Sequence, residues 1–386
     1  MSPGARQKRS LQLKLTVGKA LLDDAVAQAA RALPQSPVPP VLAGMRLHAA
    51  DGAVEVSAFD YESSARGRVP GDVGEPGTAL VPGRLLAEIV RSMPGPVVEL
   101  AADGTRMTLV SGTARFTLLQ LPAQDYPDLP QMPALSGTAG SHAFGAAVAQ
   151  VAVATGKDHT LPALTGVRTE IDGDQITLIA TDRYRLAIRQ LAWTPAQDGM
   201  QAEVLIPVRA LTDVARLAAP AAEVAIHIGA SEGFAGDPGI AGFEAGSWQA
   251  TTRLLAGEYP QVRKLIPAEF SCTAEVPAGA FIQAIKRVAL VAERNTPVRL
   301  AFTKGCVRLE ASTGDQAEAS EELDIGFDDA DFQVAFNPAY LTDGLAAAGA
   351  DTVRISMTTP KRPAVITAAD GDAGYQYLLM PVGSAG

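Results

Sequence analysis

Hydrophobic residues recur at helical spacing near the start of three separate segments of the chain. In each segment apolar side chains occupy positions i, i+4, i+7 and i+11, which is typical of a helix with one buried face. The three sets are Leu22, Val26, Ala29 and Leu33; Phe144, Val148, Val151 and Thr155; and Phe281, Ile285, Val288 and Ala292. We expect these faces to pack against a sheet.

Other segments alternate apolar and polar residues with a period of two, which predicts β-strands. The clearest are LQLKLTV from Leu11, AVEVSAF from Ala53, QITLIAT from Gln175 and CVRLEAS from Cys306. The dipeptides Asp51-Gly52 and Asp172-Gly173 are turn signals between such strands. Helices and antiparallel strands of this kind indicate an α+β fold.

The chain repeats itself at a period of 122 to 131 residues. AVAQAARALPQSPVPPVLAG aligns without a gap to AVAQVAVATGKDHTLPALTG, and Arg46, Arg168 and Arg299 then occupy equivalent positions. A period this long indicates tandem domains rather than a solenoid of short repeats. We predict three copies of one domain, at 1–134 with a basic extension at 1–10, at 135–268 and at 269–386.

A second helix is expected in each copy, after Pro82, Pro207 and Pro338, because proline fits the first turn of a helix. In the first two copies arginines follow two and nine residues after the proline. Seven residues are close to two helical turns, so each arginine pair shares one face. We expect that face to point away from the apolar residues, which are Leu85, Ile89 and Met93 in the first copy and Leu211 and Val214 in the second.

The net charge of -10 argues against a broad basic surface for nucleic acid. Basic residues gathered on the helices change that picture, because a segregated surface can hold phosphate through sequence-independent contacts. Arg31 adds to this set. The residues predicted to face DNA are Arg84, Arg91, Lys157, Arg209, Arg216, Lys286 and Arg287.

Two cysteines in no metal-ligand spacing suit a reducing compartment. The chain has no long apolar run and no signal-peptide core, so we expect a cytoplasmic protein without a membrane partner. It also lacks a phosphate loop, a GxSxG elbow and a spaced histidine or cysteine cluster. We therefore predict no cofactor, no metal and no catalytic residue.

Four segments resemble the bacterial DNA polymerase III beta subunit, the sliding clamp. They are ATDRYRLAIRQ from Ala180, LPALTGVR from Leu161, LLAGEYPQVRKLIP from Leu254 and the terminal YLLMPV, while ALVAERNTPVRL from Ala289 is similar to actinobacterial members. The resemblance implies a head-to-tail homodimer that closes a ring around double-stranded DNA. It also implies a processivity factor that tethers the replicative polymerase, the clamp loader and repair proteins.

In that family these partners bind through linear peptides, in a hydrophobic groove between the second and third domains. The resemblance places the groove at Leu164, Thr181, Arg183, Tyr184, Arg185, Leu186, Pro260, Lys264, Leu265, Asn337, Tyr340, Leu379, Met380, Pro381 and Val382. Leucine, proline and methionine give an apolar floor, and methionine adapts to differing ligands.

The chain departs from the family in three places. Arg183-Tyr184 replaces the usual small residue and histidine before Arg185, which adds bulk and charge to the groove. The chain ends in Gly383-Ser384-Ala385-Gly386 rather than in Arg-Leu, and a basic extension with Arg6, Lys8 and Arg9 precedes the first strand.

Three alternatives stay open from the sequence. The first is a specialised duplicate clamp that resists a peptide antibiotic, with cyclic peptide inhibitors among its ligands. The second is an α+β repeat scaffold that does not bind DNA, against which the arginines in register count. An enzyme comes third, since its acidic pairs are adjacent in sequence and point apart.

Overall fold

The computed structural model describes residues 13–229, 238–293, 296–313, 316–371 and 374–383. The predicted basic extension, with Arg6, Lys8 and Arg9, lies outside the described residues, as does the end of the chain from residue 384. The chain folds as two compact units. Unit 1 comprises Met1–Ser141 and Asp213–Leu254, and unit 2 comprises His142–Thr212 and Leu255–Gly386.

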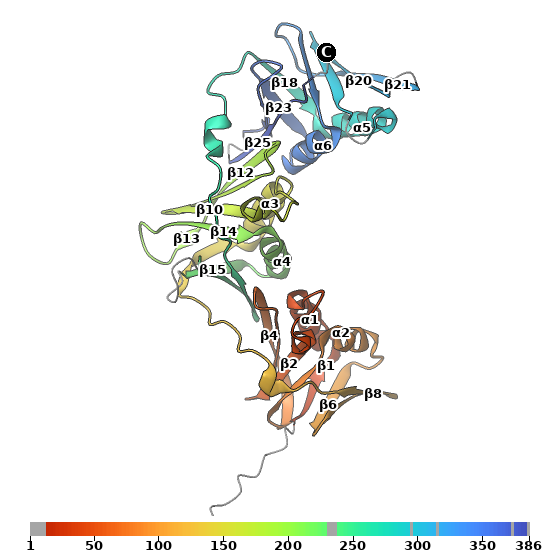
Figure 1. Cartoon of the computed structure of the whole chain (residues 1–386), viewed down its shortest axis with the longest axis vertical. Helices are drawn as coiled ribbons and strands as arrows, with labels where there is room; N and C mark the ends of the chain where they lie inside the picture. The colour runs from red at the N-terminus through yellow and green to blue at the C-terminus, as the bar shows by residue number, and fades with distance from the viewer. Residues whose placement is uncertain (1–12, 230–237, 294–295, 314–315, 372–373, 384–386) are drawn as a thin grey trace, which may run out of the picture. The chain divides into compact units, whose positions relative to one another are not determined.

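Each repeat contributes two α-helices to the described structure (Figure 1). They are α1 (Lys19–Ala29), α2 (Gly83–Ser92), α3 (Ser141–Ala152), α4 (Val208–Ala218), α5 (Ala278–Val288) and α6 (Pro338–Ala347). The first three positions of every predicted apolar stripe are buried, whereas the fourth lies beyond the end of its helix. Within the described residues, every helix is too short or too polar to reach across a lipid bilayer.

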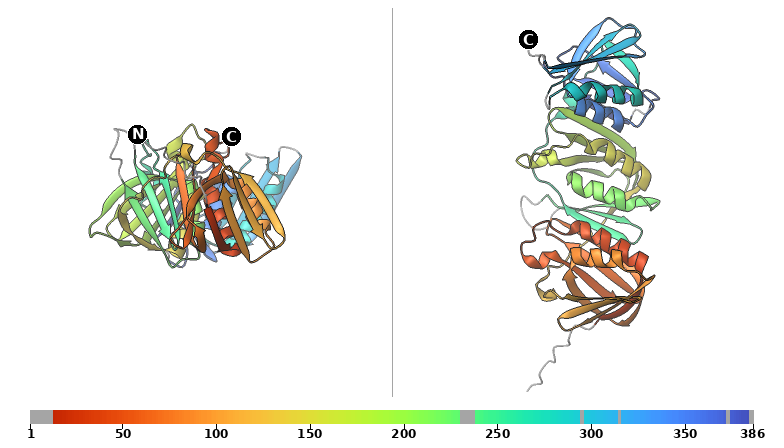
Figure 2. Two further views of the ribbon diagram at one scale, coloured as in Figure 1. Left: turned by 90° about the horizontal axis from the view of Figure 1, so that it is seen from below. Right: turned by 90° about the vertical axis from the view of Figure 1, so that its right-hand side faces the viewer.

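The strands of unit 1 pair antiparallel in the order β9-β15-β16-β17-β4-β1-β6-β7-β8, while β3 pairs with β4 and β2 pairs with both β3 and β5. Their bounds are β1 Leu13–Gly18, β2 Gly44–Ala50, β3 Ala53–Phe59, β4 Ser63–Glu75, β5 Gly77–Pro82, β6 Val97–Asp103, β7 Arg106–Ser111, β8 Ala114–Leu119, β9 Leu135–Gly140, β15 Glu223–Gly229, β16 Ile240–Ala245 and β17 Trp248–Arg253. Helices α1 and α2 lie side by side against these strands (Figure 2), and their buried faces close a core around Leu22 and Leu86.

Unit 2 holds an eight-stranded sheet, β14-β10-β11-β12-β25-β24-β23-β18, and a four-stranded sheet, β21-β20-β19-β22. The bounds are β10 Gly166–Asp172, β11 Gln175–Thr181, β12 Arg185–Ala192, β14 Gln201–Pro207, β18 Cys272–Pro277, β19 Val298–Thr303, β20 Cys306–Thr313, β21 Ala317–Asp324, β22 Phe332–Phe336, β23 Thr352–Met357, β24 Ala364–Ala368 and β25 Tyr375–Leu379. The short strand β13, Thr194–Pro195, belongs to neither of these two sheets. The predicted α+β class with antiparallel strands is confirmed.

Two sheet pairings cross from one repeat to the next. In unit 1, β4 of the first repeat pairs with β17 of the second. In unit 2, β12 of the second repeat pairs with β25 of the third. Backbone hydrogen bonds therefore join successive repeats, and the two halves of the second repeat belong to different compact units.

The apolar face predicted for α2 is wrong at one position. Leu85 is 45% exposed, and the buried residues of this helix are Leu86, Ile89 and Val90, with Met93 just after it. Because each residue turns the helix by about 100°, the stripe that includes Ile89 and Met93 continues through Leu86 rather than Leu85. The corresponding face of α4 is confirmed, since Leu211 and Val214 are buried.

Candidate functional site

A tight turn in unit 2, Asp182-Arg183-Tyr184, joins β11 to β12. The Asp182 Oδ1 atom accepts hydrogen bonds from the backbone N–H groups of Tyr184 (3.0 Å) and Arg185 (3.1 Å). Thr181 completes the turn, because its hydroxyl donates to the Arg185 carbonyl and accepts from the Arg183 N–H. An aspartate that satisfies the next backbone donors is a characteristic turn-former.

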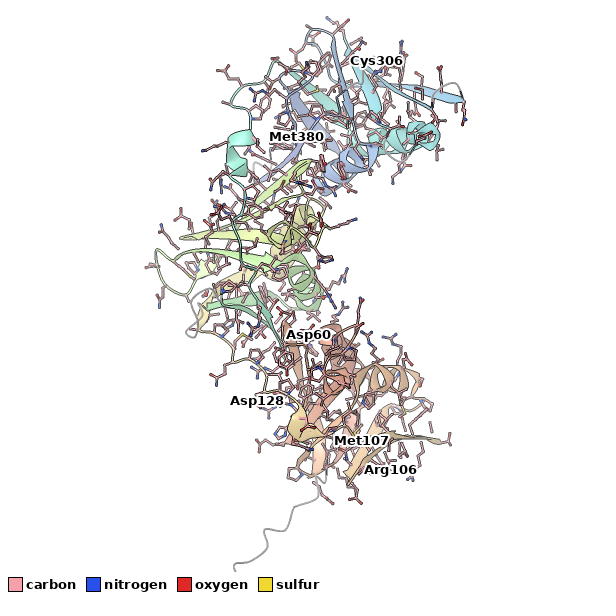
Figure 3. All side chains as sticks on the ribbon, viewed as in Figure 1. Asp60, Arg106, Met107, Asp128, Cys306 and Met380 are labelled. Carbon is pink, nitrogen blue, oxygen red and sulfur yellow. The ribbon has the colours of Figure 1, made fainter. Side chains whose placement is uncertain are left out.

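The same turn occurs in unit 1 at the equivalent place of the first repeat. Asp60, labelled in Figure 3, accepts hydrogen bonds through Oδ1 from the N–H groups of Glu62 (3.0 Å) and Ser63 (2.6 Å). The residue after each aspartate has a positive φ, 72° at Tyr61 and 80° at Arg183. Side chains with a Cβ rarely adopt this conformation, so the turn holds Arg183 in a strained conformation at the surface.

Arg185 begins β12 and is only 6% exposed. Its Nε donates to Asp182 Oδ2 at 2.9 Å, its Nη1 donates to Asp343 Oδ2 at 2.6 Å, and its guanidinium lies 4.2 Å from the ring centre of Tyr340. Burial lowers the pKa of Arg185, but Tyr377, Asp343 and Asp182 raise it by more, so the guanidinium stays charged. This side chain ties the turn of the second repeat to α6 of the third.

A depression of about 270 Å³ opens beside this turn. Its aromatic wall is formed by Tyr184 and Tyr340, whose rings stack with centres 6.4 Å apart. Hydrogen bonds from Thr160 lower the pKa of the Asp158 carboxyl at the rim, and Arg183 also lowers it. The depression is lined by Thr155, Gly156, Lys157, Asp158, Leu161, Leu164, Asp182, Arg183, Tyr184, Arg185 and Tyr340.

The structure brings five of the predicted groove residues to this depression, namely Leu164, Arg183, Tyr184, Arg185 and Tyr340. Thr181, Leu186 and Leu379 are 3%, 2% and 1% exposed. They support the site from within and offer almost no surface to a ligand, contrary to the apolar floor expected of Leu186 and Leu379.

The remaining predicted groove residues lie around the depression or away from it. Asn337 caps α6, accepting hydrogen bonds from the N–H groups of Ala339 and Tyr340. Leu265 belongs to a short 3-10 helix at Val262–Leu265 and is 50% exposed, while Pro260 and Lys264 are exposed on the same segment.

The C-terminal segment runs past the turn. Met380, labelled in Figure 3 and 37% exposed, donates its N–H to the Tyr184 carbonyl at 2.9 Å. Pro381 is half-buried, and Val382 lines a second, larger depression of about 840 Å³ over β19, β20, β21 and β22. Five of the predicted groove residues thus line the first depression and Val382 lines the second, both within unit 2.

Sequence reasoning missed Asp182 and Asp343, the two carboxylates that hold Arg185. Asp182 had a signal, since Asp60 precedes a matching turn in the first repeat. Asp343 had none, because 158 residues separate it from Arg185.

The arginines of the second helices are exposed, as their spacing predicts. Arg84 and Arg91 lie on α2, and Arg209 and Arg216 lie on α4. Arg84 also donates to the Pro34 carbonyl at 3.1 Å, which holds its side chain over the end of the first helical segment.

The other predicted DNA-facing residues divide between helix and loop. Lys286 and Arg287 are exposed on α5, and Arg287 makes two contacts to the carboxylate of Glu321 on β21. Lys157 follows α3 and lines the depression beside the Asp182 turn, so its position favours a groove role.

Three consecutive stretches of the chain match known domains. Residues 13–130 match the N-terminal domain of the DNA polymerase III beta subunit, residues 140–261 match its central domain, and residues 263–383 match its C-terminal domain. The chain belongs to the DNA polymerase III beta subunit family. The three repeats read from the sequence are the three domains of this family.

Individual relatives agree with this membership. The "Beta sliding clamp" of Streptomyces coelicolor is 46% identical over 379 residues, covering 97% of this chain and 100% of the relative. The "Beta sliding clamp homolog GriR" of Streptomyces muensis is 36% identical and covers 96% and 99%. The crystal structure of the DNA polymerase sliding clamp from Bacillus subtilis superposes with a TM-score of 0.89 at 25% identity, covering 97% and 100%. The actinobacterial type of the family is thereby supported.

Proposed function

We propose that this chain is a DNA sliding clamp. Two copies close a ring around duplex DNA, and the ring holds the replicative polymerase and its partners on the template in the cytoplasm. The exposed arginine pairs Arg84/Arg91 and Arg209/Arg216 carry the proposal, because they recur in register on repeated helices of an otherwise acidic protein. Such contacts bind phosphate without reading bases, so the ring can slide.

The depression beside the Asp182 turn supports a docking site for linear peptides. Leu161 and Leu164 give it an apolar wall, and the stacked Tyr184 and Tyr340 rings suit an aromatic or leucine anchor. Burying one such anchor contributes roughly 1.5–3 kcal/mol. Two such anchors together contribute roughly 3–6 kcal/mol.

The same proposal leaves the protein without a catalytic step. Topological linkage to DNA keeps the ring in place, so processivity needs binding and closure only. The partners are proteins that present short peptides: the polymerase, the clamp loader and repair factors.

Retention on circular DNA tests this function directly. Clamps loaded by a clamp loader and ATP onto a nicked plasmid circle should elute with the DNA on gel filtration. Cutting the circle should release them, because an open end lets a ring slide off. A protein that never elutes with the circle, or stays bound after the cut, contradicts the proposal.

A further inference from the structure

One carboxylate in unit 1 serves two arginines from different repeats. Asp213 Oδ1, on α4, accepts a hydrogen bond from Arg31 Nη1 at 3.0 Å and lies 3.6 Å from Arg216 Nη1. Arg31 belongs to the short 3-10 helix Ala30–Ala32 that follows α1, and Arg216 lies one turn after Asp213. All three side chains are partly exposed, at 38%, 23% and 67% respectively for Arg31, Asp213 and Arg216.

Other arginines of the predicted DNA-facing set are also engaged by acceptors of the protein itself. Arg287 contacts both carboxylate oxygens of Glu321, and this pairing lowers the pKa of Glu321. Arg84 donates to the Pro34 carbonyl. Several arginines predicted to contact DNA are therefore already bound to carbonyl or carboxylate oxygens of the protein when no DNA is present.

An exposed ion pair of this kind is exchangeable. Water screens it, so it adds little net stability and a phosphate oxygen can replace the carboxylate. The net free energy of the exchange, however, is only the difference between the arginine–phosphate and the arginine–carboxylate interactions. The displaced carboxylate also remains close to the phosphate and repels it. A carboxylate among arginines thus weakens each phosphate contact without removing the arginines.

We propose that Asp213 acts as a built-in competitor of the DNA backbone. It holds Arg31 and Arg216 so that their phosphate contacts are brief and weak, and the ring moves along the duplex with low friction. The inference rests on the proposed function, since it assigns to Asp213 the tuning of the same DNA-facing surface.

Substitution of Asp213 in the full-length protein tests the inference on a short linear duplex, which needs no loading. In Asp213→Asn the two arginines lose their competitor, so affinity at low salt should rise and the salt dependence should steepen. One or two strengthened phosphate contacts steepen the log-log slope by about 0.9 to 1.8. Between 50 and 200 mM salt this is a further loss of about 3- to 12-fold in affinity. Fluorescence anisotropy across salt concentrations measures both quantities.

Three control variants separate competition from other causes. Asp103→Asn removes the same charge at the turn between β6 and β7, far in sequence from these arginines, and should leave the slope unchanged. Asp213→Glu keeps the carboxylate and should behave as the unsubstituted protein. Adding Arg31→Gln and Arg216→Gln to Asp213→Asn should abolish the gain. Thermal unfolding of each variant checks that the fold persists.

Two outcomes would overturn the proposed competitor role of Asp213. Weaker binding with a flatter slope in Asp213→Asn means that the carboxylate positions the arginines for DNA, which overturns the competitor role. An unchanged slope overturns it as well. Failure of the clamp function itself shows separately, as loss of retention of the unsubstituted protein on circular DNA.

Discussion

Arg183 shows how a single backbone angle affects the rim of the site. Its φ of 80° lies in the left-handed region, where a Cβ clashes and glycine does not. The hydrogen bonds of Asp182 and Thr181 hold the turn in this shape despite the cost. The sequence predicted extra bulk and charge here, while the strain depends on an angle that the residue type does not reveal.

Replacing Arg183 should therefore affect stability in a residue-specific way. In Arg183→Gly the relief of left-handed strain, about 1–2 kcal/mol, exceeds the added flexibility of the unfolded chain, about 0.4–1 kcal/mol. We expect a gain of roughly 0.5–1 kcal/mol in the free energy of unfolding. Arg183→Ala removes the same side chain but keeps the strain, so it should show no gain. Urea denaturation of both variants decides, and equal stabilities would contradict the strain argument.

The two aspartate turns offer a matched pair. Asp182 holds two backbone N–H groups and the buried Arg185 guanidinium, whereas Asp60 holds two backbone N–H groups. Asp182→Ala leaves a buried charge partly unpaired and should cost about 3 kcal/mol. Asp60→Ala should cost about 1.5 kcal/mol, the loss of hydrogen bonds to a charged acceptor. Similar losses in chemical denaturation would mean that Arg185 does not depend on Asp182.

At the scale of elements, the sheets carry the connection between repeats. Strand β12 pairs with β25 in unit 2, and the segment after β25 continues along the Asp182 turn through the Met380 N–H. Its next contact is the hydrogen bond from the Val382 N–H to the Ala335 carbonyl on β22. The C-terminal segment thus reinforces the wall of the proposed groove.

Deleting Met380–Gly386 should therefore weaken peptide binding severely. The deletion removes the exposed Met380 surface and the hydrogen bond to Tyr184, a loss of roughly 1.5–3 kcal/mol, or about 10- to 100-fold in affinity. Calorimetry with a peptide carrying leucine and phenylalanine anchors measures this change. Dimerisation serves as the control and should persist, because the resemblance places the dimer contact at other edges. Full peptide affinity after the deletion would refute the groove.

At the scale of the whole molecule, each sheet ends in strands that pair on one side only in the described structure. Two of these edge strands are β8 in unit 1 and β21 in unit 2. Unpaired edges offer backbone donors and acceptors to another chain. Leu119 on β8 is 64% exposed, and β21 exposes polar residues at alternate positions, namely Glu318, Ser320, Glu322 and Asp324.

We therefore predict a homodimer in solution, in which an edge strand of one copy pairs with an edge strand of the other. Sedimentation equilibrium should give about twice the chain mass of 40.0 kDa at micromolar concentration. Thr117→Pro in β8 removes a backbone donor from that edge and should shift the equilibrium toward monomer. A chain that stays at 40.0 kDa at every concentration would remove the basis for a ring.

The sequence by itself determined the threefold repeat, the α+β class and the exposed arginines of α2 and α4. These features follow from local periodicity: 3.6 residues for a helix, two for a strand, and a fixed spacing from Pro82 and Pro207. A pattern that depends only on residues close together in the sequence can be recognised without knowledge of the tertiary structure. The error at Leu85 belongs to the same level, since Leu85 and Leu86 lie four and three residues before Ile89, about 40° and 60° to either side of it, and periodicity alone does not choose between them.

Only the tertiary structure decided which strands pair between repeats and which carboxylates contact the buried Arg185. The pairings of β4 with β17 and of β12 with β25 are made by backbone N–H and C=O groups. Because these groups are the same in nearly every residue, the sequence does not show which strands pair. Arg185 and Asp343 meet across 158 residues because that sheet and α6 converge. The same folding buries Leu186 and Leu379, which the sequence placed at the groove surface. Burial depends on every element that packs around a residue, so no local pattern contains it.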